Sequence, residues 1–297
     1  MSLLNITNDG LPNVLMALHS TLLRSKKPIL EQDLLDAVAP ISIVDDRGMV
    51  RNTLLRWTEL GLFVLNDGLI APSSKLSNKH ATSLDIAAFT RRIACRLALS
   101  EENNLDLWAT HGAKAADLTR SLAWMMLQDA YRASFDQFES QESQQITDSE
   151  RQLMRNSTRR LGLQYWAPFF GFSRHPHAAI DPTIAVRDSL DGILDHGQGV
   201  SARQFVTELS RVVPVLDGGR WQQEVLRYVD SRLLPRLQPG QLSSALSRAL
   251  INLWESGELL LQNKSDIGDS ITLTGVGGAR NDLIFQWIAR PKLGENQ

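Results

Sequence analysis

The sequence predicts a mainly α-helical protein with a winged helix-turn-helix at each end and a helical domain between them. Residues 47–72 have the pattern of an amphipathic helix, a glycine stop and a tight two-stranded hairpin. A similar pattern of leucine, glutamate and glycine returns near Gly257, which lies 196 positions after Gly61. The chain between the two copies has helical periodicity. We therefore place the domains at 1–73, 83–198 and 201–291.

Composition restricts the classes of function. The chain has 297 residues, of which 43% are hydrophobic and 22% charged, so it can form two or three globular domains. Its formal net charge of -2 argues against a generally basic surface, and any binding of nucleic acid must therefore be local. The single cysteine, Cys95, excludes a disulfide framework within the chain. Because no apolar run reaches membrane-spanning length, we expect a cytoplasmic protein without a membrane partner.

The first winged helix is predicted from three helices and a hairpin. The first helix begins at Asp9 or Pro12 and ends near Arg24, and a second covers Glu31 to Val38. The third helix ends at Gly61, which suits the left-handed conformation that follows many helices. Two short strands then pair across the turn at 66–68, because Asp-Gly favours a tight hairpin.

The middle of the chain is predicted to be helical. We expect helices at Leu84–Leu99, Asp106–Ala113 and Ala116–Phe138, followed by a polar loop at Glu139–Gln145. Thr147 and Glu150 have the spacing of a capping box, so a further helix should begin there and end near Leu163.

The second winged helix is predicted from the repeat. Segments 205–213 and 221–234 supply the preceding helices, and the third helix ends at Gly257. We expect a hairpin over Leu259–Thr274 with a longer polar tip, and a closing strand at Leu283–Ile288.

Two kinds of partner compete for the third helices. If these helices enter the major groove of double-stranded DNA, arginine can contact guanine and asparagine can contact adenine. The candidate DNA-binding residues are Arg47, Arg51, Asn52 and Arg56 in the first copy, and Ser244, Ser247, Arg248, Asn252 and the wing residue Lys264 in the second. Each face also carries an apolar residue beside an acid, and this pattern is typical of a protein interface. Leu55 and Ile251 are the candidate interface residues.

Other polar clusters are weaker candidates. Arg151, Arg155 and Arg159 would lie one turn apart on the helix expected from Thr147, where they could contact phosphates or form a solvated face. His175 and His177 lack the spacing of metal ligands, so we expect no metal site. No catalytic motif is present. We therefore expect a protein that is not an enzyme and has no cofactor.

Two segments resemble a known family. The opening NITNDGLPNVLMALHSTL and the central LQYWAPFFGF…IDPTIAVRDSL are similar to DpdG-type proteins. These are accessory proteins encoded with bacterial systems that insert 7-deazaguanine bases into DNA and restrict unmodified DNA. The resemblance implies a role in restriction and antiviral defence beside helicase, ATPase and nuclease partners. It transfers no catalytic residue.

The leading hypothesis is a non-enzymatic DNA- and protein-binding adaptor of such a DNA-modification-dependent restriction system, in contact with other proteins of the same gene cluster. One alternative is a scaffold that binds only proteins. Another is a winged-helix transcriptional regulator, which would sense a ligand at the aromatic run 165–172. That run is more typical of an apolar plug in a helical domain.

Overall fold

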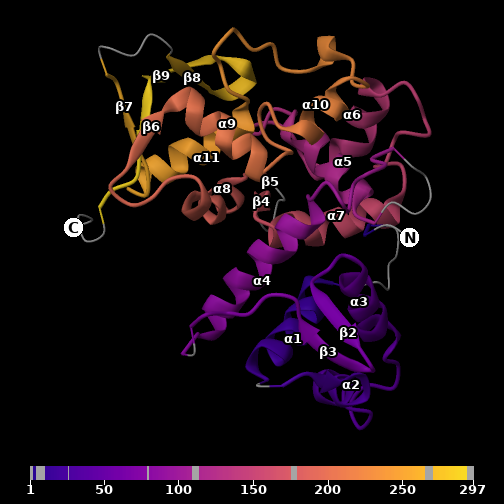
Figure 1. Cartoon of the computed structure of the whole chain (residues 1–297). Helices are drawn as coiled ribbons and strands as arrows, with labels where there is room; N and C mark the ends of the chain where they lie inside the picture. The colour runs from indigo at the N-terminus through magenta and orange to yellow at the C-terminus, as the bar shows by residue number, and fades with distance from the viewer. Residues whose placement is uncertain are drawn as a thin grey trace. The chain divides into compact units, whose positions relative to one another are not determined.

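The protein folds into two compact units, each formed by two separate stretches of chain. The computed structural model describes residues 3–4, 11–25, 27–78, 80–108, 114–174, 179–264 and 270–292, apart from the side chain of Asp282. The first unit comprises Met1–Leu118 and Asn156–Phe169, and the second comprises Thr119–Arg155 and Phe170–Gln297. Helices dominate, and the sheets are small and antiparallel, as predicted (Figure 1).

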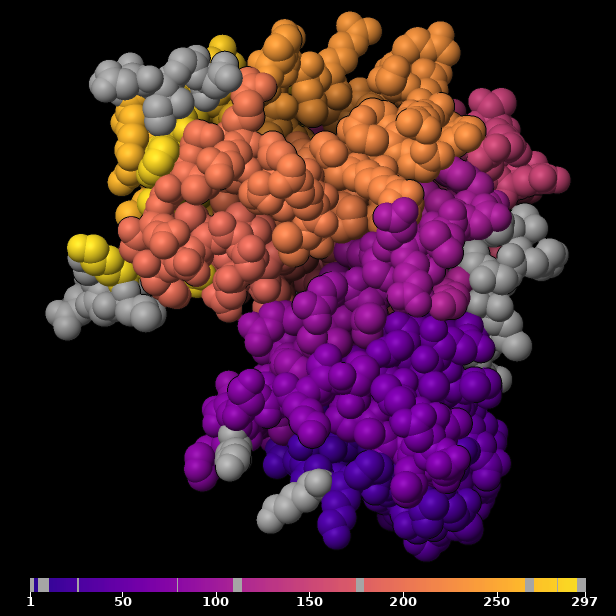
Figure 2. Space-filling view, viewed as in Figure 1, coloured from indigo at the N-terminus to yellow at the C-terminus, as the bar shows by residue number. Residues whose placement is uncertain are grey.

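The first unit contains a three-helix, three-strand arrangement followed by two further helices. Its elements are α1 (Pro12–Arg24), β1 (Ile29–Leu30), α2 (Glu31–Val38), α3 (Gly48–Glu59), β2 (Phe63–Asn66), β3 (Leu69–Pro72), α4 (Ser83–Ala98) and α7 (Ser157–Phe169). The sheet has the order β1-β3-β2, with Ile29 opposite Ile70 and Asn66 opposite Leu69. Figure 1 shows the elements from α1 to α4 in indigo to violet and α7 in rose, and Figure 2 shows the surface of the chain in the same colours.

The core of the first unit is centred on Trp57 of α3, which has no exposed surface. Its ring lies 5.6 Å from the ring of Trp166 in α7, measured between centroids. His19 of α1 is also fully buried, next to Phe63 and Phe89, and its Nδ1 lies 2.8 Å from Oγ1 of Thr90. An imidazole in such surroundings is held neutral because charging it would cost the free energy of desolvation.

The second unit contains the remaining elements. These are α5 (Ala116–Met126, which begins in the first unit), η1 (Phe135–Gln137), α6 (Phe138–Gln145), β4 (Ser173–Arg174), β5 (Ala179–Ile180), α8 (Thr183–Ser189), η2 (Leu190–Gly192), β6 (Gly199–Ser201), α9 (Ala202–Val212), α10 (Arg220–Leu226), η3 (Ser231–Leu233), α11 (Ser244–Glu255), β7 (Leu260–Gln262), β8 (Ile271–Thr274), η4 (Val276–Gly278), β9 (Arg280–Phe285) and β10 (Trp287–Ala289).

The repeat expected from the sequence is present in the backbone. Helices α3 and α11 both have 12 residues, and each begins and ends 196 positions from its counterpart. Both are followed by a glycine with positive φ, 89° at Gly61 and 72° at Gly257. In both, the amide of the residue after this glycine donates to a carbonyl five positions earlier, from Leu62 to Trp57 and from Glu258 to Leu253. Each helix therefore ends in the same Schellman motif.

The strand order repeats as well. In the second copy the order along the chain is β6, α9, α10, α11, β7 and β10, and the sheet has the order β6-β10-β7. β10 pairs with β6 on one side and with β7 on the other. In the same way, β3 of the first copy pairs with β1 on one side and with β2 on the other. Helix α8 packs on α11 as α1 packs on α3.

The expected second hairpin is wrong in its pairing. β7 pairs with β10, whereas β8 and β9 pair with each other as an insertion between them. The predicted closing strand at Leu283–Ile288 is divided at Gln286 between β9 and β10. Periodicity in the sequence predicts where strands lie but not which strands pair with each other. In β8 all four residues are buried, so no alternation of buried and exposed residues shows which face of the strand is turned to the core.

The expected central helices also differ from the observed ones. Residues 139–145 form most of α6 instead of a loop, and the helix expected from Thr147 begins only at Ser157. The carboxylate of Glu142 is buried and accepts a 2.6 Å hydrogen bond from the amide of Met154, so a long-range contact overrides local polarity. The helix expected at Ala116–Phe138 ends at Met126. Within the expected helix at Asp106–Ala113, residues 106–108 form a turn, and 109–113 lie outside the described residues.

None of the described helices is long and apolar enough to cross a bilayer.

The buried imidazole of His19 predicts a pH-dependent stability of the first unit. Burial lowers the pKa of His19 from 6.5 to about 4. The unfolded chain therefore binds the proton more readily, so stability is full above pH 6.5 and falls as the pH drops toward 4, by at most about 3 kcal/mol. Urea denaturation followed by circular dichroism at several pH values should show this slope, which is the decrease in the free energy of unfolding as the pH falls from 6.5 to 4.

The slope should be smaller in His19→Leu and unchanged in His80→Gln, which alters an exposed histidine of the same unit. Equal slopes in the wild type and in His19→Leu would contradict this assignment.

Candidate protein and nucleic-acid interfaces

Helix α3 presents a mixed face to solvent. Arg51, Asn52, Leu55 and Glu59 are all exposed, and the side chain of Leu55 is 61% accessible. Their spacing places them on one side of the helix, opposite Trp57. These four side chains therefore form a surface that is accessible to solvent.

Two of the arginines that we predict to contact DNA, Arg47 before α3 and Arg56 within it, are largely buried. Arg47 is only 7% exposed, and its Nη2 donates to Oδ1 of Asp36 at 2.5 Å, which holds the pKa of that carboxyl below its usual value. Arg56 is 4% exposed and forms a 2.9 Å ion pair with Glu59. A guanidinium taken out of water needs such partners. Both arginines are therefore part of the packing of this unit and are not placed to contact DNA.

The β2–β3 hairpin adds apolar surface that the sequence analysis did not single out. Val64, Leu65 and Leu69 are 41, 50 and 39% exposed, and Leu30 lies opposite Leu69 in the neighbouring strand. The alternation of residues along the two strands could have predicted part of this surface. Val64 and Leu69 lie on the sheet face opposite the buried Phe63 and Ile70.

The charge around this hairpin is negative. Residues 29–72 contain seven acidic and three basic side chains, and residues 60–72 contain no lysine or arginine. Because phosphate neutralisation supplies most non-specific affinity for DNA, this composition favours a protein partner.

The corresponding helix of the second unit is internal. Ser244 and Ser247 are buried, and both use their hydroxyls within the unit. Oγ of Ser244 accepts from the amide of Ala130 at 2.8 Å, and Oγ of Ser247 accepts from the amide of Thr274 at 2.8 Å. Nη1 of Arg248 donates to the carbonyls of Ala130 and Ile180. All three side chains therefore have partners within the unit, and their contact with DNA stays a prediction.

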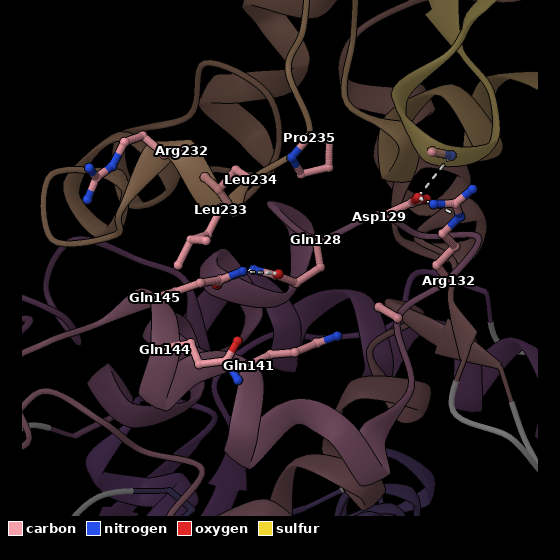
Figure 3. Close-up of a pocket in the computed structure, with 12 residues that line it drawn as sticks. Gln128, Asp129, Arg132, Gln141, Gln144, Gln145, Arg232, Leu233, Leu234 and Pro235 are labelled. Carbon is pink, nitrogen blue, oxygen red and sulfur yellow. Dashed lines mark hydrogen bonds and ion pairs between the residues drawn. The ribbon is translucent and has the colours of Figure 1, made fainter.

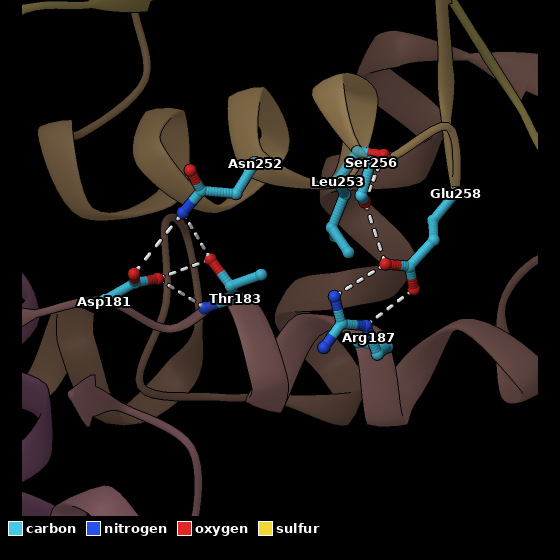
Figure 4. A network of polar contacts seen from close by, with 7 residues as sticks. All are labelled: Asp181, Thr183, Arg187, Asn252, Leu253, Ser256 and Glu258. Carbon is cyan, nitrogen blue, oxygen red and sulfur yellow. Dashed lines mark hydrogen bonds and ion pairs between the residues drawn. The ribbon is translucent and has the colours of Figure 1, made fainter. Parts of the chain in front are cut away.

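Asn252 is held in a polar network between α8 and α11 (Figure 4). Its Nδ2 donates to Oγ1 of Thr183 at 2.9 Å and to Oδ2 of Asp181 at 3.3 Å. One turn away, Arg187 and Glu258 form two hydrogen bonds of 2.6 Å. The amide of Asn252 therefore joins α11 to the start of α8, and its contact with DNA stays a prediction.

The remaining candidates of the second copy lie elsewhere. Ile251 is half-buried, so it is less available to a partner than Leu55. Lys264 is exposed, and its Nζ lies 3.4 Å from the centroid of the Trp287 ring.

The expected arginine stripe does not form. Arg151 precedes α7, bonds Asp148 at 2.9 Å and stacks over Tyr228, with 3.9 Å between Cζ and the ring centroid. Arg155 also precedes α7, whereas Arg159 lies inside it. The three arginines therefore do not share one helical face, because the helix begins later than the capping-box pattern indicated. Their contact with phosphates stays a prediction. His175 and His177 lie outside the described residues.

Comparison with known proteins supplies the family. A family model described as DpdG-like matches residues 1–267. The chain belongs to the DpdG-like family. This confirms the resemblance of the opening and central segments. No curated protein and no solved structure gives a match.

The network around Asn252 predicts a large effect of one added charge. Asn252→Asp places a second carboxylate beside the buried Asp181, so we expect the second unit to lose about 3 kcal/mol of stability, against about 1–2 kcal/mol for Asn252→Ala. Urea denaturation followed by circular dichroism measures both. Glu255→Gln, an exposed change on the same helix, is the control. A wild-type midpoint for Asn252→Asp would contradict the role of this network.

Proposed function

We propose that this DpdG-like protein is a non-enzymatic adaptor of a bacterial dpd restriction system and that it binds a partner protein through its N-terminal unit. The observation that carries the proposal is the 61% exposure of Leu55 on α3, between Arg51 and Glu59. An apolar side chain surrounded by charged ones is a common arrangement at protein interfaces. The apolar surface of the β2–β3 hairpin and the acidic charge of residues 29–72 support the same reading.

The element order supports an interpretation of both copies as winged helices. Residues 12–72 follow the order helix, strand, helix, helix, strand, strand, and the second copy follows it from α8 to β10, with α10 and the β8–β9 hairpin as additions. In this interpretation the first copy keeps its third helix accessible. The second copy uses the same helix to organise its own unit, which suits a scaffold better than a second DNA reader.

The aromatic run gives little support to a ligand-sensing regulator. Trp166, Phe170 and Phe172 are almost completely buried. These three rings pack in the apolar cores of their units. They are therefore not accessible to a ligand, which a ligand-sensing regulator would require.

The protein-binding proposal predicts that one charge on α3 disrupts the complex. Leu55→Asp should reduce co-purification with the other proteins of the gene cluster by at least tenfold, because burying an unpaired carboxylate at an interface costs more than 1.4 kcal/mol. The measurement is affinity capture of the tagged chain expressed with its gene cluster, followed by identification of the retained proteins.

The matched control is Leu84→Asp, which alters a leucine of the same unit that is 82% exposed on α4. Both variants should melt like the wild type. If Leu55→Asp and Leu84→Asp retain the same partners, α3 is not the interface.

A second candidate function is contact with double-stranded DNA, and one observation favours it. Arg51 and Asn52 are adjacent and exposed in the N-terminal half of α3, where recognition helices carry their base contacts. The seven acidic side chains of residues 29–72 oppose it.

Mobility-shift titration at two salt concentrations tests the DNA contact. If α3 reads DNA, Arg51→Ala should weaken binding about tenfold, since a good arginine contact to guanine contributes about 1–3 kcal/mol. The control is Arg96→Ala, an exposed arginine on α4. Unchanged migration of modified, unmodified and random duplexes at low salt would exclude this candidate.

A further inference from the structure

The sheet of the first unit turns an apolar face to solvent. Phe63 and Ile70 lie on its inner face, where the ring of Phe63 is 5.8 Å from that of His19 in α1, measured between centroids. Residues directly opposite each other in an antiparallel sheet share a face, and neighbours along a strand lie on opposite faces. The register therefore places five residues on the outer face, namely Leu30, Val64, Asn66, Leu69 and Ala71.

The composition of this outer face is unusual for a surface in water. Four of its five residues are apolar, and Leu30, Val64 and Leu69 are exposed. A face of an antiparallel sheet that is turned to water normally carries polar residues. An exposed apolar face is therefore typical of a surface that a partner covers.

The second copy of the repeat has the same face. Leu260 lies 196 positions after Val64, and in the same register Trp287 corresponds to Leu69. Here a lysine of the same unit covers the face, since Nζ of Lys264 lies 3.4 Å from the centroid of the Trp287 ring. A lysine suits such a surface because its alkyl stem contacts apolar groups while its ammonium reaches the polar edge.

The first copy lacks this side chain. Lys264 lies 196 positions after Gly68, so the turn of the first hairpin has a glycine where the second copy has its lysine. The equivalent cationic side chain can be supplied to the first face by a partner.

The charge at this end of the sheet favours such a partner. The amide of Glu31 donates to the carbonyl of Gly68 at 3.3 Å, which places Glu31 beside Asp67, and both carboxylates are exposed. All seven acidic side chains of residues 29–72 are exposed, whereas two of the three basic ones, Arg47 and Arg56, are buried. This surface therefore attracts a cationic partner and repels DNA.

The width of the face suits one helix. Three strands spaced by about 4.8 Å span about 10 Å, which is close to the diameter of one α-helix with its side chains. A helix with an apolar stripe can thus cover the sheet, while lysines or arginines beside the stripe reach the carboxylates of Glu31 and Asp67.

The cavity of about 410 Å³ in the second unit selects a ligand less clearly (Figure 3). Its buried amides, Gln128 and Gln145, hydrogen-bond each other at 2.9 and 3.1 Å, and the indole of Trp124 donates to the same oxygen of Gln145. These polar groups are already paired within the unit, so the outer face of the first sheet is the stronger binding surface.

We infer that the outer face of the β1-β3-β2 sheet docks a basic amphipathic helix of a partner protein. Apolar side chains of this helix cover the exposed leucines and valine, and its cationic side chains pair with Glu31 and Asp67. The inference rests on the proposed function, because it assigns the partner's chemistry to a second surface of the same unit. A second copy of this chain would bring the same acidic residues to the face and so lacks the complementary charge.

Fluorescence anisotropy of a labelled peptide tests this inference with the purified full chain. The probe is a helical peptide of about 18 residues, or about five turns, that carries leucine along one face and lysine on both sides of it. One control peptide has glutamate in place of lysine, and another has the same residues in scrambled order. We expect the lysine peptide to bind at least tenfold more tightly than either control.

Removal of the apolar surface should weaken this binding. The double variant Val64→Thr with Leu69→Thr keeps β-branched residues in the strands and should bind the peptide at least tenfold more weakly, because buried methyl groups are lost. The matched control is Leu260→Thr, which alters the position equivalent to Val64 in the second copy and should leave the affinity unchanged.

Removal of the carboxylates tests the charge and leaves the apolar face intact. Glu31→Gln with Asp67→Asn should weaken the peptide about threefold or more at low salt and by less at high salt, because exposed ion pairs are screened. Asparagine tolerates the positive φ of 49° at position 67. The control, Glu102→Gln with Asp106→Asn, removes the same charge from exposed positions of the first unit and should leave the affinity unchanged.

Four results would overturn the inference. Three concern the peptide: equal binding by the wild type and the Val64→Thr, Leu69→Thr variant, equal binding of the lysine and glutamate peptides, and no binding of the lysine peptide at about 1 mM. The fourth is a wild-type dimer in light scattering that the same double variant converts to a monomer, because a second copy would then cover the face.

Partner capture by Leu55→Asp is a separate measurement. Capture lost in Leu55→Asp, together with a peptide affinity that does not depend on the sheet variants, would overturn this inference and leave the proposed function standing. Capture unchanged in Leu55→Asp, together with a peptide affinity that does depend on the sheet, would overturn the interface on α3 and support this inference.

Discussion

The polar side of α11 is the constraint on which the second unit depends. Ser244, Ser247 and Arg248 bond backbone groups of the segment after α5, of β5 and of β8. These backbone groups are taken away from water, and buried amides and carbonyls must find partners. One helix supplies them for several segments that are distant in sequence. Ser244 and Ser247, which a DNA-binding helix would expose to solvent, are therefore buried here and hydrogen-bonded to the surrounding backbone.

The two copies of the repeat have consequently diverged in use while keeping their geometry. The position of Arg51 in the first copy is taken by Ser247 in the second, and that of Leu55 by Ile251. The side chain of Arg51 is exposed to solvent, whereas Ser247 is enclosed and its hydroxyl is hydrogen-bonded to the amide of Thr274. The change from arginine to serine decides which face of the helix can be covered. The first copy remains available to a partner, and the second has become internal architecture.

The sequence was a good guide to elements and a poor one to their surroundings. Gly61 and Gly257 marked the same helix end in both copies, because a left-handed position has a strong residue preference. Polar residues have no such preference for one environment. An arginine or asparagine in a helical pattern can face either water or a buried partner. The burial of Arg56 and the buried partners of Asn252 could therefore not be predicted from their positions in the sequence. The pairing of β7 with β10 and the helix at 138–145 depend on contacts far along the chain. The three domain boundaries stay a prediction.

The division into two interleaved units has a consequence for synthesis on the ribosome. The first unit needs residues 156–169 and is complete in sequence once Phe169 has emerged. Residues 119–155 belong to the other unit, and their partners in α11 lie 116 and 118 positions away from Gln128 and Ala130. This stretch can form its internal contacts, such as those of Gln145 with Trp124 and Gln128, but its partners in α11 are missing until the last third of the chain is made. Contacts of such long range close slowly, and the exposed intermediate is the stage at which a nascent chain most needs a chaperone.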